Sequence, residues 1–244
     1  MGSHTKFEKE DNKKNLSSKI SLDRVSKDLL AKGHLVIHEL FSEVEVDFLL
    51  NEIEASISIA DNVHIKLDSS VNDEPLVVTH LDKYSRLLGS IHHGEMLEEI
   101  SRRYLGIEAI PLHIEYFCKP PKCKVATDAH QDHSFYNSHF HDELALSIWV
   151  ALDDIDKDMA PIEFLDKSIN YLLPHVESDE SAVNFKLSNN IDGNFRPVTL
   201  RKGDAIIFHS LAIHRSGVSS SSKTRRALVF NFRGSPYKEW CSSL

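Results

Sequence analysis

The second half of the chain is a series of short strand candidates, and this pattern limits the possible folds most. The candidates show the two-residue alternation of strands and are rich in branched and aromatic residues. Turn-forming pairs such as Pro120-Pro121 and Asp192-Gly193 separate them. The candidates are 112–118, 144–152, 195–200, 205–209 and 226–232. Strands at this spacing predict a β-sandwich or a barrel.

The first half is predicted to be mainly helical. A helix over 24–32 ends at Gly33, and a short strand follows over 34–40. Ser42 and Glu45 have the spacing of a capping box at the start of a second helix, and 95–104 predict another. The segment 61–93 is ambiguous, with strand-like runs at 63–67 and 75–79, and the charged residues 1–19 are expected to be disordered. Helices followed by strands indicate an α+β chain, with one domain over 20–244.

Composition excludes several classes of protein. The net charge is −9, so a basic face for nucleic acid is not expected. No apolar run is long enough for a membrane helix, and no signal peptide is recognisable. The three cysteines, an odd number without a framework spacing, are expected to be reduced thiols. We therefore expect a cytoplasmic protein.

The motif His130-Gln131-Asp132 is the sharpest chemical signal in the chain. At the end of a strand, the histidine and the aspartate point to the same side, because strand side chains alternate with period two. One imidazole and one carboxylate are then neighbouring metal ligands. A distant histidine would complete the 2-His-1-carboxylate set of non-haem Fe(II) oxygenases, and His214, which follows a strand, is the best candidate. A pair of this kind can also be merely structural.

Four segments in this order resemble the phytanoyl-CoA dioxygenase family of Fe(II)/2-oxoglutarate oxygenases. They are HQDHSFY, LSIWVALDD, RKGDAIIFHS and HRSG…RRAL, and the resemblance extends from about residue 24 to 235. It implies a double-stranded β-helix (a cupin-like jelly-roll) with a core over about 108–235 and N-terminal helices packed on one sheet. It also implies Fe(II) as cofactor, with 2-oxoglutarate and O2 as co-substrates.

The resemblance assigns roles to six residues. His130, Asp132 and His214 match the metal ligands of the family. Ser216 matches a hydroxyl that binds the co-substrate carboxylate, and Arg225 matches the arginine that clamps its far carboxylate. The family also has an upstream lysine that reaches the co-substrate, and Lys83 is its nearest match here.

Strand parity favours Arg225 over its neighbour Arg226 as the carboxylate clamp. Arg225, Ala227, Val229 and Asn231 share one face of their strand, which is small and polar as a ligand pocket requires. The other face carries Leu228, Phe230 and Phe232 beside Arg226 and is suited to packing under helices. A guanidinium group also fits a carboxylate in a bidentate manner.

The same parity places His113, Glu115, Phe117 and Lys119 on one face of the strand 112–118 and its extension. Three polar groups there predict the lining of a pocket for a polar substrate, or else a solvent-exposed edge strand. Trp149 is either a core residue or a wall of the substrate pocket. His133, His139 and His141 follow the ligand pair, and they could face substrate, face solvent or hold a second metal.

The substrate cannot be read from the sequence, because DKDMAPIEFLDKSIN departs from the family pattern in a loop that often borders the pocket. Asp132 favours hydroxylation, since halogenases of the family replace this carboxylate with a small residue. A small organic metabolite is expected as substrate, while the oligomeric state is not predicted. Three alternatives remain: a non-catalytic binding protein on the same barrel, a zinc hydrolase or isomerase, and another oxidative outcome such as desaturation, epimerisation or ring formation.

Overall fold

A computed structural model describes residues 29, 31–62, 65–68, 74–105, 109–136, 143–167, 169 and 171–236. The predicted tail 1–19 and most of the predicted helix 24–32 lie outside the described residues, and so do His139, His141 and Cys241. Within the described part, no helix has the length and apolar character needed to cross a membrane.

A large antiparallel sheet forms one wall of the molecule. Its order is β1-β11-β6-β13-β4-β3-β2. In that order, the strands span His34–Ile37, Ala205–His209, Glu143–Ala151, Arg225–Pro236, Ile110–Lys119, Glu74–Val78 and Ile65–Asp68. Strands distant in the sequence are thus neighbours, as β13 lies between β6 and β4.

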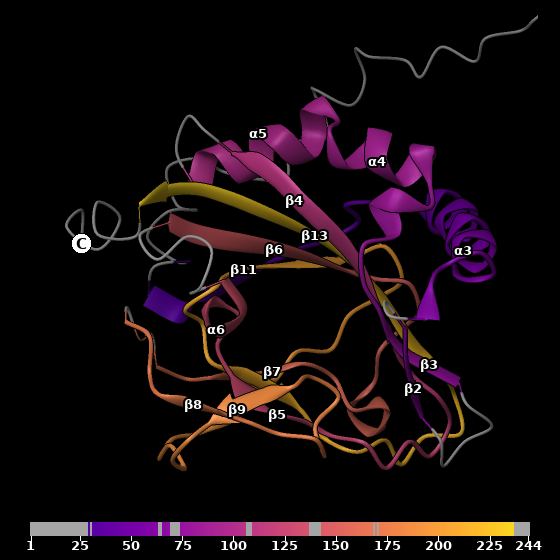
Figure 1. Cartoon of the computed structure of the whole chain (residues 1–244). Helices are drawn as coiled ribbons and strands as arrows, with labels where there is room; N and C mark the ends of the chain where they lie inside the picture. Colours follow the sequence, from indigo (N-terminus) through magenta and orange to yellow (C-terminus); the bar gives the residue numbers. More distant parts are fainter. Residues whose placement is uncertain are drawn as a thin grey trace, which may run out of the picture.

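A smaller antiparallel sheet faces the first, in the order β10-β7-β12-β5. Its strands span Phe195–Pro197, Glu163–Leu165, His214–Ser216 and Thr127–His130. A separate hairpin joins β8 (His175–Glu177) to β9 (Phe185–Leu187). Two facing antiparallel sheets with crossing connections form a jelly-roll, which confirms the predicted fold class (Figure 1).

Three helices cover the outer face of the large sheet (Figure 1). They are α3 (Glu43–Ile57), α4 (Arg86–His92) and α5 (Glu95–Leu105), and η2 (Leu81–Lys83) leads into α4. The predicted capping box is present at the start of α3, because Ser42 and Glu45 each accept a hydrogen bond from the backbone of the other. The short helix α6 (His133–Tyr136) lies instead between the sheets, and η3 (Lys157–Met159) precedes β7.

Two apolar clusters follow from the alternation along β13. Leu228, Phe230 and Phe232 pack with the helices on the outer side of the large sheet. Ala227 and Val229 belong to a second cluster between the sheets. Alternate residues of β13 therefore belong to the two clusters on opposite sides of the sheet, as the sequence predicts.

The five strand candidates of the second half correspond to β4, β6, β10, β11 and β13, whereas β5, β7, β8, β9 and β12 were not among the candidates. The candidate 195–200 is shorter, because β10 ends at Pro197 and only Leu200 makes a further isolated bridge, to Ile155. The alternative of an exposed edge for residues 112–118 is wrong, since β4 lies between β13 and β3.

Candidate metal centre and its cavity

The three predicted metal ligands meet at one point between the sheets. His130 and His214 are direct partners in the β5–β12 pairing, and Asp132 follows β5 by two residues. Oδ1 of Asp132 lies 3.3 Å from Nε2 of His130 and 3.4 Å from Nε2 of His214. One ligand atom from each residue falls within 4.8 Å of the others, and no other group of three such residues in the described part of the chain meets this criterion. The donor set fits a divalent ion of the Fe(II) type.

Backbone carbonyls orient both imidazoles toward this point. Nδ1 of His130 lies 2.8 Å from the carbonyl oxygen of Asp128, and Nδ1 of His214 lies 3.1 Å from that of Ala212. Because a carbonyl oxygen only accepts, each Nδ1 carries the proton. In the neutral rings, Nε2 therefore presents a lone pair to the centre, which is the arrangement of a metal-ligating histidine.

Burial and neighbouring charge set the protonation of the centre. Burial, together with the neighbouring His130, lowers the pKa of His214 to about 4. Burial alone would raise the pKa of Asp132, but the two histidines and the hydroxyl of Ser147 hold it below its ordinary value. At neutral pH the set therefore offers an imidazole lone pair from His214 and the carboxylate of Asp132.

A chain of polar side chains supports Asp132 from behind. Oγ of Ser147 lies 3.1 Å from Oδ2 of Asp132 and 2.9 Å from Oδ1 of Asn231. Nδ2 of Asn231 in turn donates to Oε2 of Glu115 at 3.0 Å. The centre is thus connected to the polar face of β4 across β6 and β13.

Arg225 is a buried cation with few partners inside the protein. Its side chain lies in the cavity wall. Among the described residues its Nε has no hydrogen-bond partner, and Nη1 donates to the carbonyl oxygen of Ala160 at 3.4 Å. Burial lowers the pKa of Arg225 to about 10, so the guanidinium stays charged at neutral pH. An orphaned, buried guanidinium fits a carboxylate ligand. Ser216 also lines the cavity, with its hydroxyl donating to the carbonyl of Ala160.

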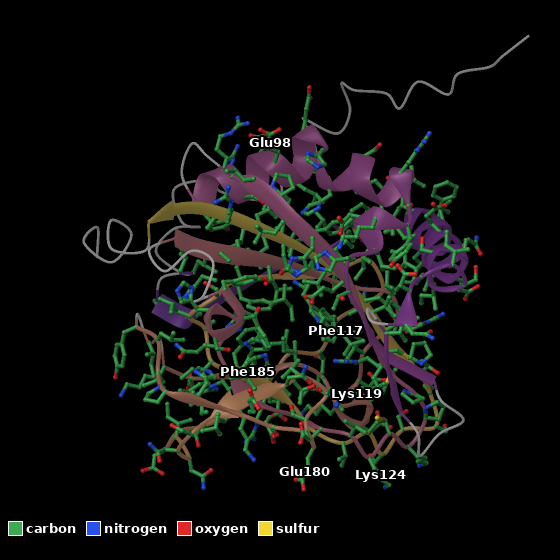
Figure 2. All side chains as sticks on the ribbon, in the orientation of Figure 1. Glu98, Phe117, Lys119, Lys124, Glu180 and Phe185 are labelled. Carbon is green, nitrogen blue, oxygen red and sulfur yellow. The ribbon has the colours of Figure 1, made fainter. Side chains whose placement is uncertain are left out.

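The ligand set and Arg225 open onto one cavity of about 550 Å³ between the sheets. Its aromatic wall residues are Phe117, Phe135, Tyr136, Trp149 and Phe208, and its polar ones include Thr79, His113, Glu115, Thr127 and Asn184. Phe117 lies in the space between the sheets, whereas Glu98 points outward from the helix layer (Figure 2). Trp149 is both a core residue and a cavity wall, since it belongs to the inner cluster and its ring lies 5.4 Å from the guanidinium carbon of Arg225.

The structure does not bring three of the predicted residues to the cavity wall. Lys83 is exposed in η2, whose Leu81 packs in the outer apolar cluster with the helices, so its position does not support a co-substrate role. Lys119 is buried, but Nζ donates to the carbonyl oxygens of Val125 and Gly217 instead of facing the cavity. His133 is buried as well, and its Nδ1 lies 3.1 Å from the hydroxyl of Ser210.

Strand parity could have identified some of the residues that sequence reasoning missed. Ser147 lies on the same strand face as Trp149, so its inward position was available from the alternation, as it was for Asn231 on the predicted pocket face of β13. Phe135 and Tyr136 reach the cavity from α6, a single turn after the ligand pair that has no periodic signal. Asn184 arrives with the β8–β9 hairpin, which no local pattern predicted.

Comparison with known proteins places this arrangement in a family. The sequence model of the family "Phytanoyl-CoA dioxygenase (PhyH)" matches residues 30–227. The chain belongs to the phytanoyl-CoA dioxygenase family. As expected from the sequence, the described domain is therefore of the non-haem iron, 2-oxoglutarate-dependent dioxygenase class, whose cofactor is iron and whose co-substrate is 2-oxoglutarate.

The individual relatives are distant. The phytanoyl-CoA dioxygenase domain-containing protein 1 of Danio rerio is 24% identical over 167 residues, which cover 66% of this chain and 57% of that protein. The chain thus spans little more than half of that relative's length.

Among solved structures, EvdO2 from Micromonospora carbonacea var. aurantiaca, complexed with 2-oxoglutarate, has a TM-score of 0.71 at 20% identity, covering 87% of this chain and 91% of that one. The α-ketoglutarate-dependent epimerase SnoN from nogalamycin biosynthesis has a TM-score of 0.68 at 18% identity, covering 88% and 83%. At these identities the likeness shows the shared fold.

Proposed function

We propose that this protein hydroxylates an unactivated C–H bond of a small organic molecule in an Fe(II)- and 2-oxoglutarate-dependent reaction that releases succinate and CO2. One observation supports this most: the His130–Asp132–His214 set and the orphaned guanidinium of Arg225 open onto the same cavity. A metal-ligand set alone would serve many reactions. A buried cation beside it supplies the place for a dicarboxylate co-substrate.

The residues of the chain divide the work. His130, Asp132 and His214 hold the metal on one side, and Ser147 keeps the carboxylate of Asp132 in place. Arg225 binds the far carboxylate of 2-oxoglutarate, and we assign Ser216 to the same carboxylate. When bound, iron supplies the activation of O2 and the cleavage of the C–H bond. Aromatic walls around the centre exclude water and orient the substrate.

Other functions fit the site less well. A zinc hydrolase or isomerase would leave Arg225 without a task, because no carboxylate among the described residues pairs with it in a hydrogen bond or salt bridge. A non-catalytic binding protein would not need the complete set. Another oxidative outcome stays open as the second candidate, because a protein of the same fold is an epimerase.

We further propose one domain over 20–244 with its jelly-roll core over about 108–235, small molecules in place of nucleic acid as ligands, and a cytoplasmic location. Cys118 and Cys123 are buried and are not joined in a disulfide, which supports a reducing compartment. The cavity volume suits a small molecule. Imaging of the tagged full-length chain would test the location.

Succinate release tests the function. The full chain is incubated with Fe(II), ascorbate, 2-oxoglutarate and a pool of metabolites, and succinate and a product heavier by one oxygen atom are measured. Asp132→Ala is expected to abolish substrate-coupled succinate. Asp166→Asn, in an exposed ion pair with Arg196, is the matched control and should behave as wild type. Coupled hydroxylation by the Asp132→Ala variant would contradict the ligand assignment, and a product two hydrogens lighter would identify desaturation.

A further inference from the structure

The charged side chains of the cavity wall have distinct partners, and one remains for the substrate. The wall contains Glu115, Asp132, Arg215 and Arg225 as its acidic and basic members. Asp132 faces the metal position and Arg225 faces the co-substrate. Nε of Arg215 donates to Glu163 at 2.7 Å, outside the lining set. Glu115 is therefore the carboxylate of the described wall with no assigned task in the proposed reaction.

Glu115 lines the cavity, and while one of its oxygens is held by the protein, the other has only a longer contact with His113. Oε2 accepts from Nδ2 of Asn231 at 3.0 Å. Oε1 lies 3.6 Å from Nε2 of His113, which is too long for a hydrogen bond. The side chain of Glu115 retains 21% of its exposure, although it lies between the two sheets. The structure thus fixes the direction of this carboxylate and leaves one oxygen available.

The surroundings of Glu115 suit a cation better than a neutral polar group. Phe117 shares its face of β4, and Tyr136 lines the same cavity, with its ring centroid 6.2 Å from that of His113. A carboxylate among aromatic rings is a favourable site for an organic cation, because ring faces attract positive charge. Burial is the largest single influence on the pKa of His113 and lowers it, but Glu115 together with the charges of Asp82 and Asp132 raises it by more, so the net pKa lies above its ordinary value. The raised pKa shows that this part of the cavity favours positive charge, and an ammonium group, which carries three donors, can place its charge there and donate to Oε1.

We propose that Glu115 is the substrate-recognition residue and that the substrate carries a basic nitrogen, as a primary or secondary ammonium group. This inference rests on the proposed function, because it assigns Arg225 and the metal centre to other ligands. The ammonium group donates to Oε1 of Glu115, and the hydrocarbon part extends past the aromatic wall to the metal. A substrate with a carboxylate or phosphate at this end is rejected, since it would face a like charge in a partly buried site.

Binding of three small probes tests the proposal. The full chain, loaded with Fe(II) and 2-oxoglutarate under exclusion of O2, is titrated with cyclohexylmethylamine, cyclohexylmethanol and cyclohexanecarboxylate, and affinities are measured by calorimetry. The amine is expected to bind at least about tenfold more tightly than the alcohol, as a charge-assisted hydrogen bond allows, and the carboxylate most weakly.

Glu115→Gln is the decisive variant, because its carbonyl oxygen can still accept from Asn231 while the charge is lost. It should remove the preference for the amine and leave the affinity for 2-oxoglutarate unchanged. The control Asp166→Asn should show the amine preference and the 2-oxoglutarate affinity of the wild type. Equal binding of amine and alcohol, no amine binding at millimolar concentration, or an amine preference that survives Glu115→Gln would each overturn the proposal. A wild-type chain that does not bind 2-oxoglutarate would instead contradict the proposed function.

Discussion

The two faces of β13 differ sharply in polarity. Leu228, Phe230 and Phe232 are fully buried against the helix layer and carry no polar side-chain atom. On the other face, Arg225 and Asn231 are buried to nearly the same degree, yet both are polar. A single strand thus contributes packing energy on one side and ligand-binding groups on the other.

This difference indicates that the helix-side face of β13 stabilises the fold, whereas the inner face lowers its stability. Apolar groups on the helix side gain free energy simply by leaving water. A buried, poorly paired guanidinium loses hydration without full compensation, and burial lowers its pKa to about 10 as a sign of that cost. The inner face is therefore arranged for a ligand that is bound later, and its variants should affect binding more than folding.

The largest expected effect is on the helix side. Phe230→Ala should lower the free energy of unfolding by about 3–5 kcal/mol, because it leaves a cavity under the helices where the ring packs near Phe41 and His92. Urea denaturation, followed by circular dichroism, measures this change in the free energy of unfolding. Val229→Ala, one residue away on the inner face, should cost clearly less. Equal costs would mean that both faces support the fold alike.

The next largest effect is expected on the inner face, where a substitution should weaken ligand binding and leave folding intact. Arg225→Met should weaken 2-oxoglutarate binding about 100-fold, or roughly 2.7 kcal/mol, because the dicarboxylate loses its bidentate partner. The free energy of unfolding should stay the same or rise, since a buried charge is removed. Titration of the Fe(II)-loaded chain with 2-oxoglutarate, followed by the charge-transfer absorbance, gives the affinity.

Arg226→Met provides the matched control for that experiment. Arg226 points to the opposite face and forms hydrogen bonds with Asp153 at 2.6 and 3.0 Å. Its loss should reduce stability and leave the 2-oxoglutarate affinity unchanged. A control that weakens the co-substrate as much as Arg225→Met would show that the parity argument assigned the wrong arginine.

Sequence reasoning succeeded where a pattern repeats along one strand. The alternation over 225–232 separated the two faces correctly, and the same argument applied to Glu115 places it in the cavity wall. Resemblance to a family predicted a ligand set whose three side chains lie together in the structure, because the motifs occur in a fixed order. The first signal is the alternation within one strand, and the second is the order of motifs along the sequence. Neither requires knowledge of which segments meet in the folded state.

Lys119 shows where such reasoning fails. Parity placed it with Glu115 and Phe117, but it is the last residue of β4, and its long side chain turns to the carbonyls of Val125 and Gly217. The position of the terminal group of a long side chain depends on the segments that surround it, and these come together only in the folded state. Lys83 failed for a related reason, because an isolated residue without a surrounding motif carries no directional information.

Lys119 provides the third test, through the pH dependence of stability. Burial, together with the nearby Arg225, lowers its pKa to about 7 in the folded protein. The unfolded chain then binds more protons above pH 7, so the free energy of unfolding contributed by this group rises with pH. Relative to Lys119→Met, the wild type should gain about 2 kcal/mol between pH 7 and 9. Lys83→Met, at an exposed site, should follow the wild type, and a parallel pH profile for Lys119→Met would show that Lys119 is solvated.

The smallest effect concerns the connection between the metal centre and the inner face. Ser147→Ala removes the hydroxyl next to Oδ2 of Asp132, and Fe(II) affinity should fall about tenfold, as for other partners that orient a metal ligand. Ser101→Ala is the control on the helix side, because that hydroxyl donates only within α5, to the carbonyl of Leu97. Competition with a chelator measures both affinities. If the two variants bind Fe(II) equally well, Asp132 is held by its backbone and its neighbouring histidines alone. The polar chain to Glu115 would then act on the substrate without influencing the metal.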